Sequence, residues 1–97
     1  MTYVLTAKWT AKEGEEDRVR AALEQLTGPS RAEPGCLFYQ PHVDPENPRV
    51  FFIYEQYADE DACKAHGESE HFQRIGLGEA IPLLENRERA FYETLDV

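Results

Sequence analysis

The stretch "CLFYQPHVDPENPRVFFIYEQY" (Cys36–Tyr57) decides the fold, because it holds two apolar runs separated by a polar segment. That segment, "DPENPR" (44–49), is rich in proline and charged residues, which mark turns. The flanking runs, 36–43 and 50–57, are rich in aromatic and β-branched residues, as strands are. We therefore expect a β-hairpin, and Pro41 predicts that its first strand lies near a sheet edge or a bulge.

The segment before the hairpin predicts one strand and one helix. "YVLTAKW" (3–9) alternates in the manner of a strand with two distinct faces. From Glu15 to about Thr27, acidic residues crowd the first turn and Gly28-Pro29 supplies a stop, so we expect a helix there. Its apolar residues at helical spacing are Val19, Ala22, Leu23 and Leu26.

The segment after the hairpin predicts a broken helix and a last strand. Asp59 can cap a helix that Gly67 interrupts, and Ser69 can cap a second piece. Gly76, Gly78 and Pro82 then break any long helix, and "RAFYETLDV" (89–97) predicts a fourth strand. The order β-α-β-β-α-β is that of a ferredoxin-like α+β domain, with both helices on one face of an antiparallel sheet. We expect one such domain over residues 1–97.

The expected sheet has more apolar surface than its helices can cover. Both faces of the hairpin strands carry large apolar or aromatic side chains, among them Phe38, Tyr39, Phe51, Phe52, Ile53 and Tyr54. Covering each such side chain is worth about 1.5 to 3 kcal/mol. A second copy packed on the open face would supply that cover, so the sequence predicts a symmetric homodimer.

Composition removes several classes of partner. The chain has 97 residues, with 10 basic and 19 acidic side chains and a net charge of −9. Nucleic acids and anionic membranes require a basic face, so we expect neither as a partner. Apolar runs are far shorter than the roughly 20 residues of a membrane span, and the first residues lack the pattern of a signal peptide. The sequence therefore indicates a cytoplasmic protein.

Motifs for cofactors are equally sparse. "GLGEAI" (76–81) lacks the third glycine of a dinucleotide loop and follows a helical pattern rather than a strand. Cys36 and Cys63 lie in apolar contexts without metal-binding spacing, so buried thiols are expected rather than a disulfide or zinc site. We expect no dedicated cofactor.

The polar groups able to act in an apolar space are few. Histidine is the natural general base near neutral pH, and tyrosine or tryptophan can donate a hydrogen bond while its ring packs on a flat substrate. His66 and His71 are candidate catalytic residues, although either can also be structural, whereas His42 precedes a turn and is expected to be solvated. The aromatic and acidic candidates are Trp9, Tyr39, Tyr54, Glu55 and Tyr92.

A metal site built on the two histidines is not expected. Five residues along an ideal helix turn by about 140°, which would place His66 and His71 on different faces unless the break at Gly67 reorients one of them. Glu70 or Glu55 would complete a two-histidine, one-carboxylate set, but nothing in the spacing enforces it.

The segment "EPGCLFYQPHVDPENPRVFFIYEQYADEDACKAHGESEHFQ" (33–73) resembles the antibiotic biosynthesis monooxygenase family. The resemblance rests on "EPGC" (33–36), "YEQY" (54–57) and "AHGESEHF" (65–72), and extends over nearly the whole chain. It implies a dimeric α+β barrel of two ferredoxin-like protomers, each with a pocket between sheet and helices. For the better understood members it also implies oxygenation of quinols, anthrones or other phenols without metal or flavin.

Departures from the family patterns narrow the expectation. Haem-degrading relatives carry an asparagine late in the first strand, where this chain has Ala7, and a tryptophan where it has His66. Their haem-ligating histidine follows the "HF" segment, where this chain has Gly76. Quinol monooxygenases are closer, as are isomerases that process a phosphorylated autoinducer sugar, and a non-catalytic small-molecule-binding dimer is a further alternative. The acidic charge favours a neutral quinol over a phosphosugar.

The resemblance places the "AH" and "HF" pairs beside the pocket mouth, which selects the expected site. His66 is the first candidate for catalysis and His71 the second. The residues expected to hold the aromatic substrate, which would react with O₂, are Tyr54, Glu55, Tyr39, Trp9 and Phe72.

Overall fold

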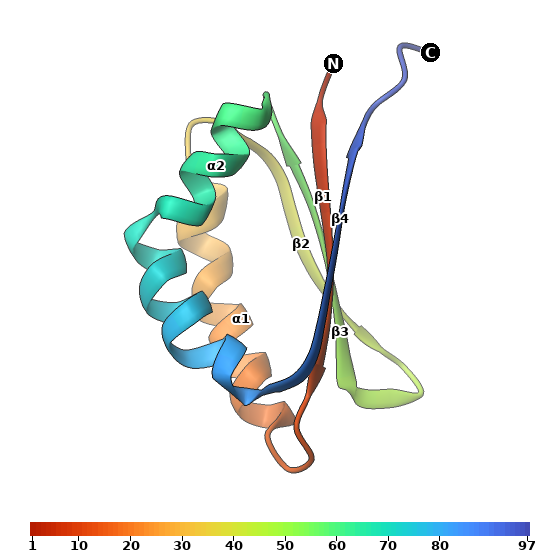
Figure 1. Ribbon diagram of the computed structural model, residues 1–97, viewed down its shortest axis with the longest axis vertical. Coiled ribbons are helices and arrows are strands. Elements are labelled where there is room, and N and C mark those ends of the chain that lie inside the picture. The colour runs from red at the N-terminus through yellow and green to blue at the C-terminus, as the bar shows by residue number, and fades with distance from the viewer.

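The computed structural model describes residues 1–97 and shows a four-stranded sheet with all helices on one face (Figure 1). This β-α-β-β-α-β arrangement confirms the expected ferredoxin-like fold. None of the helices has the length and apolar character that crossing a membrane requires. The elements are β1 (Tyr3–Ala11), α1 (Glu16–Arg31), β2 (Cys36–Asp44), β3 (Asn47–Tyr57), α2 (Glu60–Glu68), η1 (Phe72–Ala80), η2 (Ile81–Leu83) and β4 (Leu84–Glu93).

The sheet is antiparallel, with the strand order β2-β3-β1-β4. β2 lies at an edge and its register with β3 shifts near both ends, as Pro41 predicts. The turn of the hairpin is shorter than expected, because β3 already begins at Asn47. Arg49 holds this extension in place: its Nε donates to the Ala11 carbonyl at 2.9 Å, and its guanidinium pairs with Glu85.

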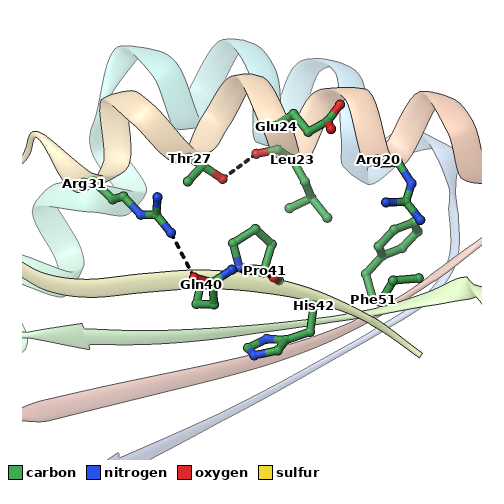
Figure 2. Close-up of a pocket in the computed structure, with 10 residues that line it drawn as sticks. Arg20, Leu23, Glu24, Thr27, Arg31, Gln40, Pro41, His42 and Phe51 are labelled. Atoms are coloured by element: carbon green, nitrogen blue, oxygen red, sulfur yellow. Dashed lines mark hydrogen bonds between the residues drawn. The ribbon is translucent and has the colours of Figure 1, made fainter. Parts of the chain in front are cut away.

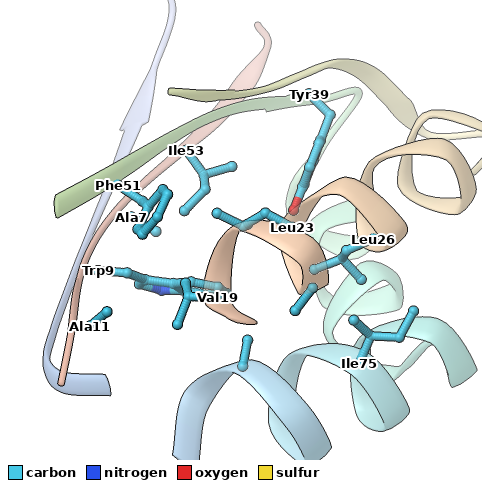
Figure 3. Packing of buried hydrophobic residues seen from close by; sticks show 12 residues of the cluster. Ala7, Trp9, Ala11, Val19, Leu23, Leu26, Tyr39, Phe51, Ile53 and Ile75 are labelled. Atoms are coloured by element: carbon cyan, nitrogen blue, oxygen red, sulfur yellow. The ribbon is translucent and has the colours of Figure 1, made fainter. Parts of the chain in front are cut away.

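The core lies between the inner sheet face and α1. Alternate residues of β3, including Phe51 and Ile53, face the helices and pack against Leu23 and Leu26 (Figure 3). Ile75 of η1 belongs to the same cluster and packs against it from the helical side. The apolar side chains that alternate along β3 therefore pack against those at helical spacing on α1 and form one apolar layer.

Two boundaries differ from the sequence expectation. α1 continues through Gly28-Pro29 to Arg31, since Ser30 is fully buried and the Arg31 side chain donates to the Tyr39 carbonyl at 2.9 Å. The Arg31 hydrogen bond offsets the backbone hydrogen bond that proline cannot make. The second difference is that β4 covers Leu84–Glu93 rather than 89–97, because η1 is a π-helix that ends early enough for residues 84–88 to pair with β1.

The outer sheet face has no helix over it (Figure 1). Phe38, Phe52 and Tyr92 lie on it with 47%, 40% and 57% of their surface exposed. Tyr54 is on the same face, and its ring lies 5.8 Å from that of Phe38. The protomer therefore leaves an aromatic surface uncovered, as the expected homodimer requires.

Candidate active site

The turn after α1 brings a carboxylate next to α2. Glu33 donates its N–H to the Ser30 carbonyl, and its own carbonyl accepts from the Cys36 N–H at 3.1 Å. Gly35 then packs directly on α2: a Cβ at this position would lie 2.4 Å from the Ala62 Cβ. Only glycine permits that approach, so the turn fixes where Glu33 lies relative to α2.

His66 reaches this carboxylate from the last turn of α2. The helix begins at an N-cap in which the Asp59 side chain accepts from the Ala62 N–H at 2.8 Å. His66 is 4% exposed, and its Nδ1 lies 2.8 Å from the Glu33 Oε2. Because an ionised carboxylate only accepts hydrogen bonds, His66 carries its proton on Nδ1. The other ring nitrogen, Nε2, is then free to act as a base.

His71 meets the same carboxylate oxygen, with its Nε2 2.5 Å from the Glu33 Oε2. The two histidines are therefore not separated as they would be on an ideal helix. The expected break reorients one of them, but it lies at Ser69 rather than Gly67: Ser69 is extended, with ψ 152°. Ser69 Oγ donates to the His66 carbonyl at 2.6 Å and accepts from the Phe72 N–H, and this turn returns His71 to Glu33.

A second carboxylate faces His66 from β3. Glu55 Oε1 lies 3.8 Å from His66 Nε2 and accepts a hydrogen bond from the Tyr57 hydroxyl at 2.5 Å. The rings of Tyr57, Tyr39 and Phe72 lie 5.6, 5.8 and 5.2 Å from the His66 ring. His66 therefore lies between two carboxylates and within an aromatic enclosure.

A cavity of about 70 Å³ adjoins His66. Five of the seven predicted site residues line it: Trp9, Tyr39, Glu55, His66 and Phe72. His71 lies behind His66 and does not line it, and Tyr54 points to the opposite sheet face. The remaining lining residues are Leu5, Ala7, Ile53, Cys63, Gly67, Arg87 and Arg89.

Sequence reasoning missed Glu33, Arg87 and Arg89. Glu33 is part of the "EPGC" motif, so its chemistry was available, but nothing local pairs it with a histidine 33 residues away. The two arginines have the spacing of residues on one face of a strand, a signal that was lost because β4 was expected to begin at Arg89.

Burial sets the protonation of the groups around the cavity. It raises the pKa of Glu55 to about 7, although the Tyr57 hydrogen bond opposes the shift. It lowers the pKa of His66, against the opposing effect of Glu33. Burial, followed by the Glu55 charge, raises the pKa of Cys63 to about 11, so this thiol stays protonated. A neutral imidazole and a carboxyl that titrates near neutral pH thus lie side by side.

Trp9 adds an unused donor. It is 4% exposed and lines the cavity, and its Nε1–H has no acceptor among the protein atoms (Figure 3). A buried donor without a partner costs about 1 to 3 kcal/mol. A ligand oxygen in the cavity would satisfy it.

The three ligand atoms of Glu33, His66 and His71 lie within 4.8 Å of one another, a set of types that can bind a divalent cation. Each imidazole already donates to the carboxylate, so a cation there must displace both protons. The expectation that this protein uses no metal stays a prediction.

The largest hollow, of about 380 Å³, lies elsewhere, between α1 and β2 (Figure 2). Its polar groups serve one another: Arg31 donates to Gln40, and the Thr27 hydroxyl donates to the Leu23 carbonyl. His42 also lines it, but its Nδ1 bonds the Phe52 carbonyl rather than a carboxylate. No base is paired with a carboxylate there, so we place the candidate site in the smaller cavity.

Comparisons with known proteins agree with this architecture. The family model described as antibiotic biosynthesis monooxygenase matches residues 2–76. The crystal structure of PA3566 from Pseudomonas aeruginosa is 37% identical, with a TM-score of 0.88 over 97% of this chain and 94% of that one. SO0527 from Shewanella oneidensis is 27% identical, with a TM-score of 0.87 over 94% and 88% of the two chains.

A further solved structure, described as an antibiotic biosynthesis monooxygenase, is 26% identical, with a TM-score of 0.88 over 98% of this chain and 99% of that one. A comparison with curated proteins finds no match. The family match covers most of the chain, including the Glu33 turn, β3 and both histidines. The chain belongs to the antibiotic biosynthesis monooxygenase family.

Proposed function

We propose that this protein is a cofactor-independent monooxygenase that oxidises a quinol, anthrone or similar phenolic molecule with O₂. The observation that carries the proposal is the Glu33–His66 pair at an aromatic cavity. Glu33 holds the proton on Nδ1, which leaves Nε2 as the base. Burial lowers the pKa of His66, so the imidazole is neutral and able to accept a proton near neutral pH.

The first step is removal of a phenolic proton by His66 Nε2. The Glu33 carboxylate stabilises the imidazolium that results, and the Trp9 Nε1–H donates to the phenolate oxygen. An electron-rich phenolate in a dry site reduces O₂ itself, and a C–O bond then forms at a ring carbon. Loss of water leaves a hydroxyquinone from a quinol: one oxygen atom enters the product and the other departs as water, so the two substrates balance the two products.

The cavity must widen to admit such a substrate. Its volume of about 70 Å³ is well below the roughly 300 Å³ of small ligand pockets. Phe72, which begins the π-helical η1, forms one wall, and π-helices are frequent at functional sites. We expect this ring to swing outward when substrate enters.

The functional unit in this proposal is a homodimer. Phe38, Phe52 and Tyr92 on the uncovered sheet face are 40% to 57% exposed in the protomer, and a second copy of the same sheet offers a matching apolar surface. Packing the two outer faces together would bury these rings in a symmetric interface.

Oxygen uptake by metal-stripped protein tests the function. With naphthohydroquinone as substrate, uptake should exceed the autoxidation blank and fall at least about tenfold in His66→Ala, a loss of about 1.4 kcal/mol of transition-state stabilisation. His42→Ala is the matched control, because His42 lies outside the cavity. Saturable binding without uptake would instead identify a non-catalytic binding protein.

A proton-transferring isomerase is the second candidate, favoured by the adjacent His66 and Glu55. His66 is a base and Glu55 is a carboxyl with a pKa of about 7, and both line the same cavity. Together they can remove a proton from one carbon of a substrate and return it to another. Incorporation of solvent deuterium into a sugar phosphate without O₂, lost in Glu55→Gln, would favour this reading over oxygenation.

A further inference from the structure

Two arginines of β4 lie at the opening of the cavity. Arg87 and Arg89 pair in register with Trp9 and Ala7 of β1, so both are on the inner sheet face that carries the catalytic groups. Both line the cavity together with Glu55, and both remain exposed to solvent. Positive charge is therefore presented where a ligand would enter.

Neither arginine forms a direct ion pair with a protein carboxylate, although the charge of Arg89 acts on Glu55 at longer range. Arg18, Arg49 and Arg74 each form an ion pair with a glutamate, whereas Arg87 and Arg89 form neither an ion pair nor a side-chain hydrogen bond. Arg20 also lacks an ion pair, but it does not line this cavity. The Arg89 guanidinium instead lies 5.4 Å from the centre of the Phe91 ring.

We propose that Arg87 and Arg89 form an anion-binding subsite, and that the substrate is an aromatic molecule carrying a carboxylate or phosphate group. The inference rests on the proposed function for the aromatic part of the substrate. Residues two apart on a strand lie about 7 Å from each other, so two guanidinium groups can converge on one anion between them. Guanidinium binds carboxylate and phosphate oxygens in a bidentate manner.

The local charges revise the sequence expectation of a neutral quinol. Net charge acts at long range and is screened by salt, whereas the arginines contact the ligand directly. Partial burial, and secondarily repulsion by the nearby Arg89, lowers the pKa of Arg87. A bound anion would relieve that repulsion and leave the ring of the substrate directed toward His66.

Calorimetric titration of the full chain with three inert probes tests the subsite apart from turnover. Naphthoate and naphthyl phosphate carry the anion, and naphthalenemethanol is the neutral counterpart. We expect at least one anion to bind more tightly than the alcohol. That advantage should fall about tenfold in Arg87→Gln or Arg89→Gln, as for the loss of a charge-assisted hydrogen bond, while affinity for the alcohol stays unchanged.

Arg20→Gln is the matched control. It removes the same charge from an exposed arginine of α1 that lines only the larger hollow. Equal affinity of all three probes, or a loss of anion binding in Arg20→Gln as large as in the β4 variants, would overturn the subsite. So would Arg87 and Arg89 variants that change the mass in light scattering but leave anion binding intact.

The remaining outcomes separate the subsite from the proposed function. If the β4 variants fail to fold, the salt dependence of probe binding to the unmutated protein tests the subsite instead. The affinity for naphthoate should fall as ionic strength rises, and the affinity for the alcohol should not. Anion binding that depends on Arg87, without any oxygen uptake, would keep the subsite and refute the monooxygenase. Oxygen uptake that is unchanged in both arginine variants and unaffected by the anionic group of the substrate would keep the monooxygenase and refute the subsite.

Discussion

Replacing Glu33 by glutamine should disable His66 while leaving its ring in place. The carboxylate accepts from His66 Nδ1 and His71 Nε2 through one oxygen, at 2.8 and 2.5 Å. An amide has no charge, and its NH₂ group can donate to Nδ1, which would move the imidazole proton to Nε2 and remove the base. A hydrogen bond to a charged group is worth about 1.5 to 3 kcal/mol. At 1.36 kcal/mol for each factor of ten, kcat/KM should fall by about 10- to 150-fold.

The assay is oxygen uptake with naphthohydroquinone above the autoxidation blank, with thermal unfolding of each variant measured in parallel. Glu70→Gln is the matched control, because Glu70 is nearby in sequence but pairs only with Arg74 at the surface. A rate in Glu33→Gln equal to that of the control, in a variant that folds normally, would refute the assignment of Glu33 as the residue that positions His66.

Three further predictions concern the carboxyl, the cavity wall and the open sheet face. Folded Glu55 keeps its proton up to about pH 7, whereas the unfolded chain loses it near pH 4.5, so the folded state binds more protons between these values. The free energy of unfolding should therefore fall by about 3 kcal/mol as pH rises across that window. Urea unfolding of the Glu55→Gln variant at several pH values should lack this decline. Gly76→Ala would place a Cβ 2.7 Å from the Phe72 ring and crowd the ring that forms this cavity wall, at a cost in stability of about 1 to 3 kcal/mol. KM for the quinol should rise as well, and an unchanged KM would contradict the role of Phe72 as a wall. Phe52→Glu should turn a dimer into a monomer in light scattering, whereas Leu77→Glu, equally exposed on η1, should not; a wild-type monomer at micromolar concentration would defeat the homodimer.

The sequence predicted the order of elements well because strands and helices differ in the period of their apolar residues. The Asp59 cap of α2 and the Ser69 cap after it were also visible, since capping is a local property. The predicted end of the helix at Gly28-Pro29 was wrong, because α1 extends to Arg31. Both residues disfavour helix locally, but the buried Ser30 and the Arg31 hydrogen bond to Tyr39 come from the tertiary structure, which a local pattern does not contain.

The candidate site was predicted less evenly. Tyr54 and Glu55 were both expected to face the substrate, yet adjacent residues of a strand point to opposite faces, so at most one could do so. Burial of Ile53 and Tyr57 identifies the odd-numbered face as the inner one, which assigns Glu55 to the cavity and Tyr54 to the outer face. The alternation was present in the sequence, and only the direction of the inner face had to come from the structure.

The "EPGC" turn joins folding to chemistry, which explains why it is informative about the family although only Glu33 among its four residues takes part in the candidate site. Gly35 lets the turn approach Ala62 on α2, and its carbonyl accepts the Ala58 N–H at 2.9 Å just before that helix. These contacts fix the distance between Glu33 and the last turn of α2, where His66 lies. A carboxylate that must hold an imidazole proton tolerates little displacement, because hydrogen bonds weaken steeply when distance and angle depart from their optimum. The packing of a glycine on a helix therefore sets the protonation of a histidine about one turn of that helix away from the contact.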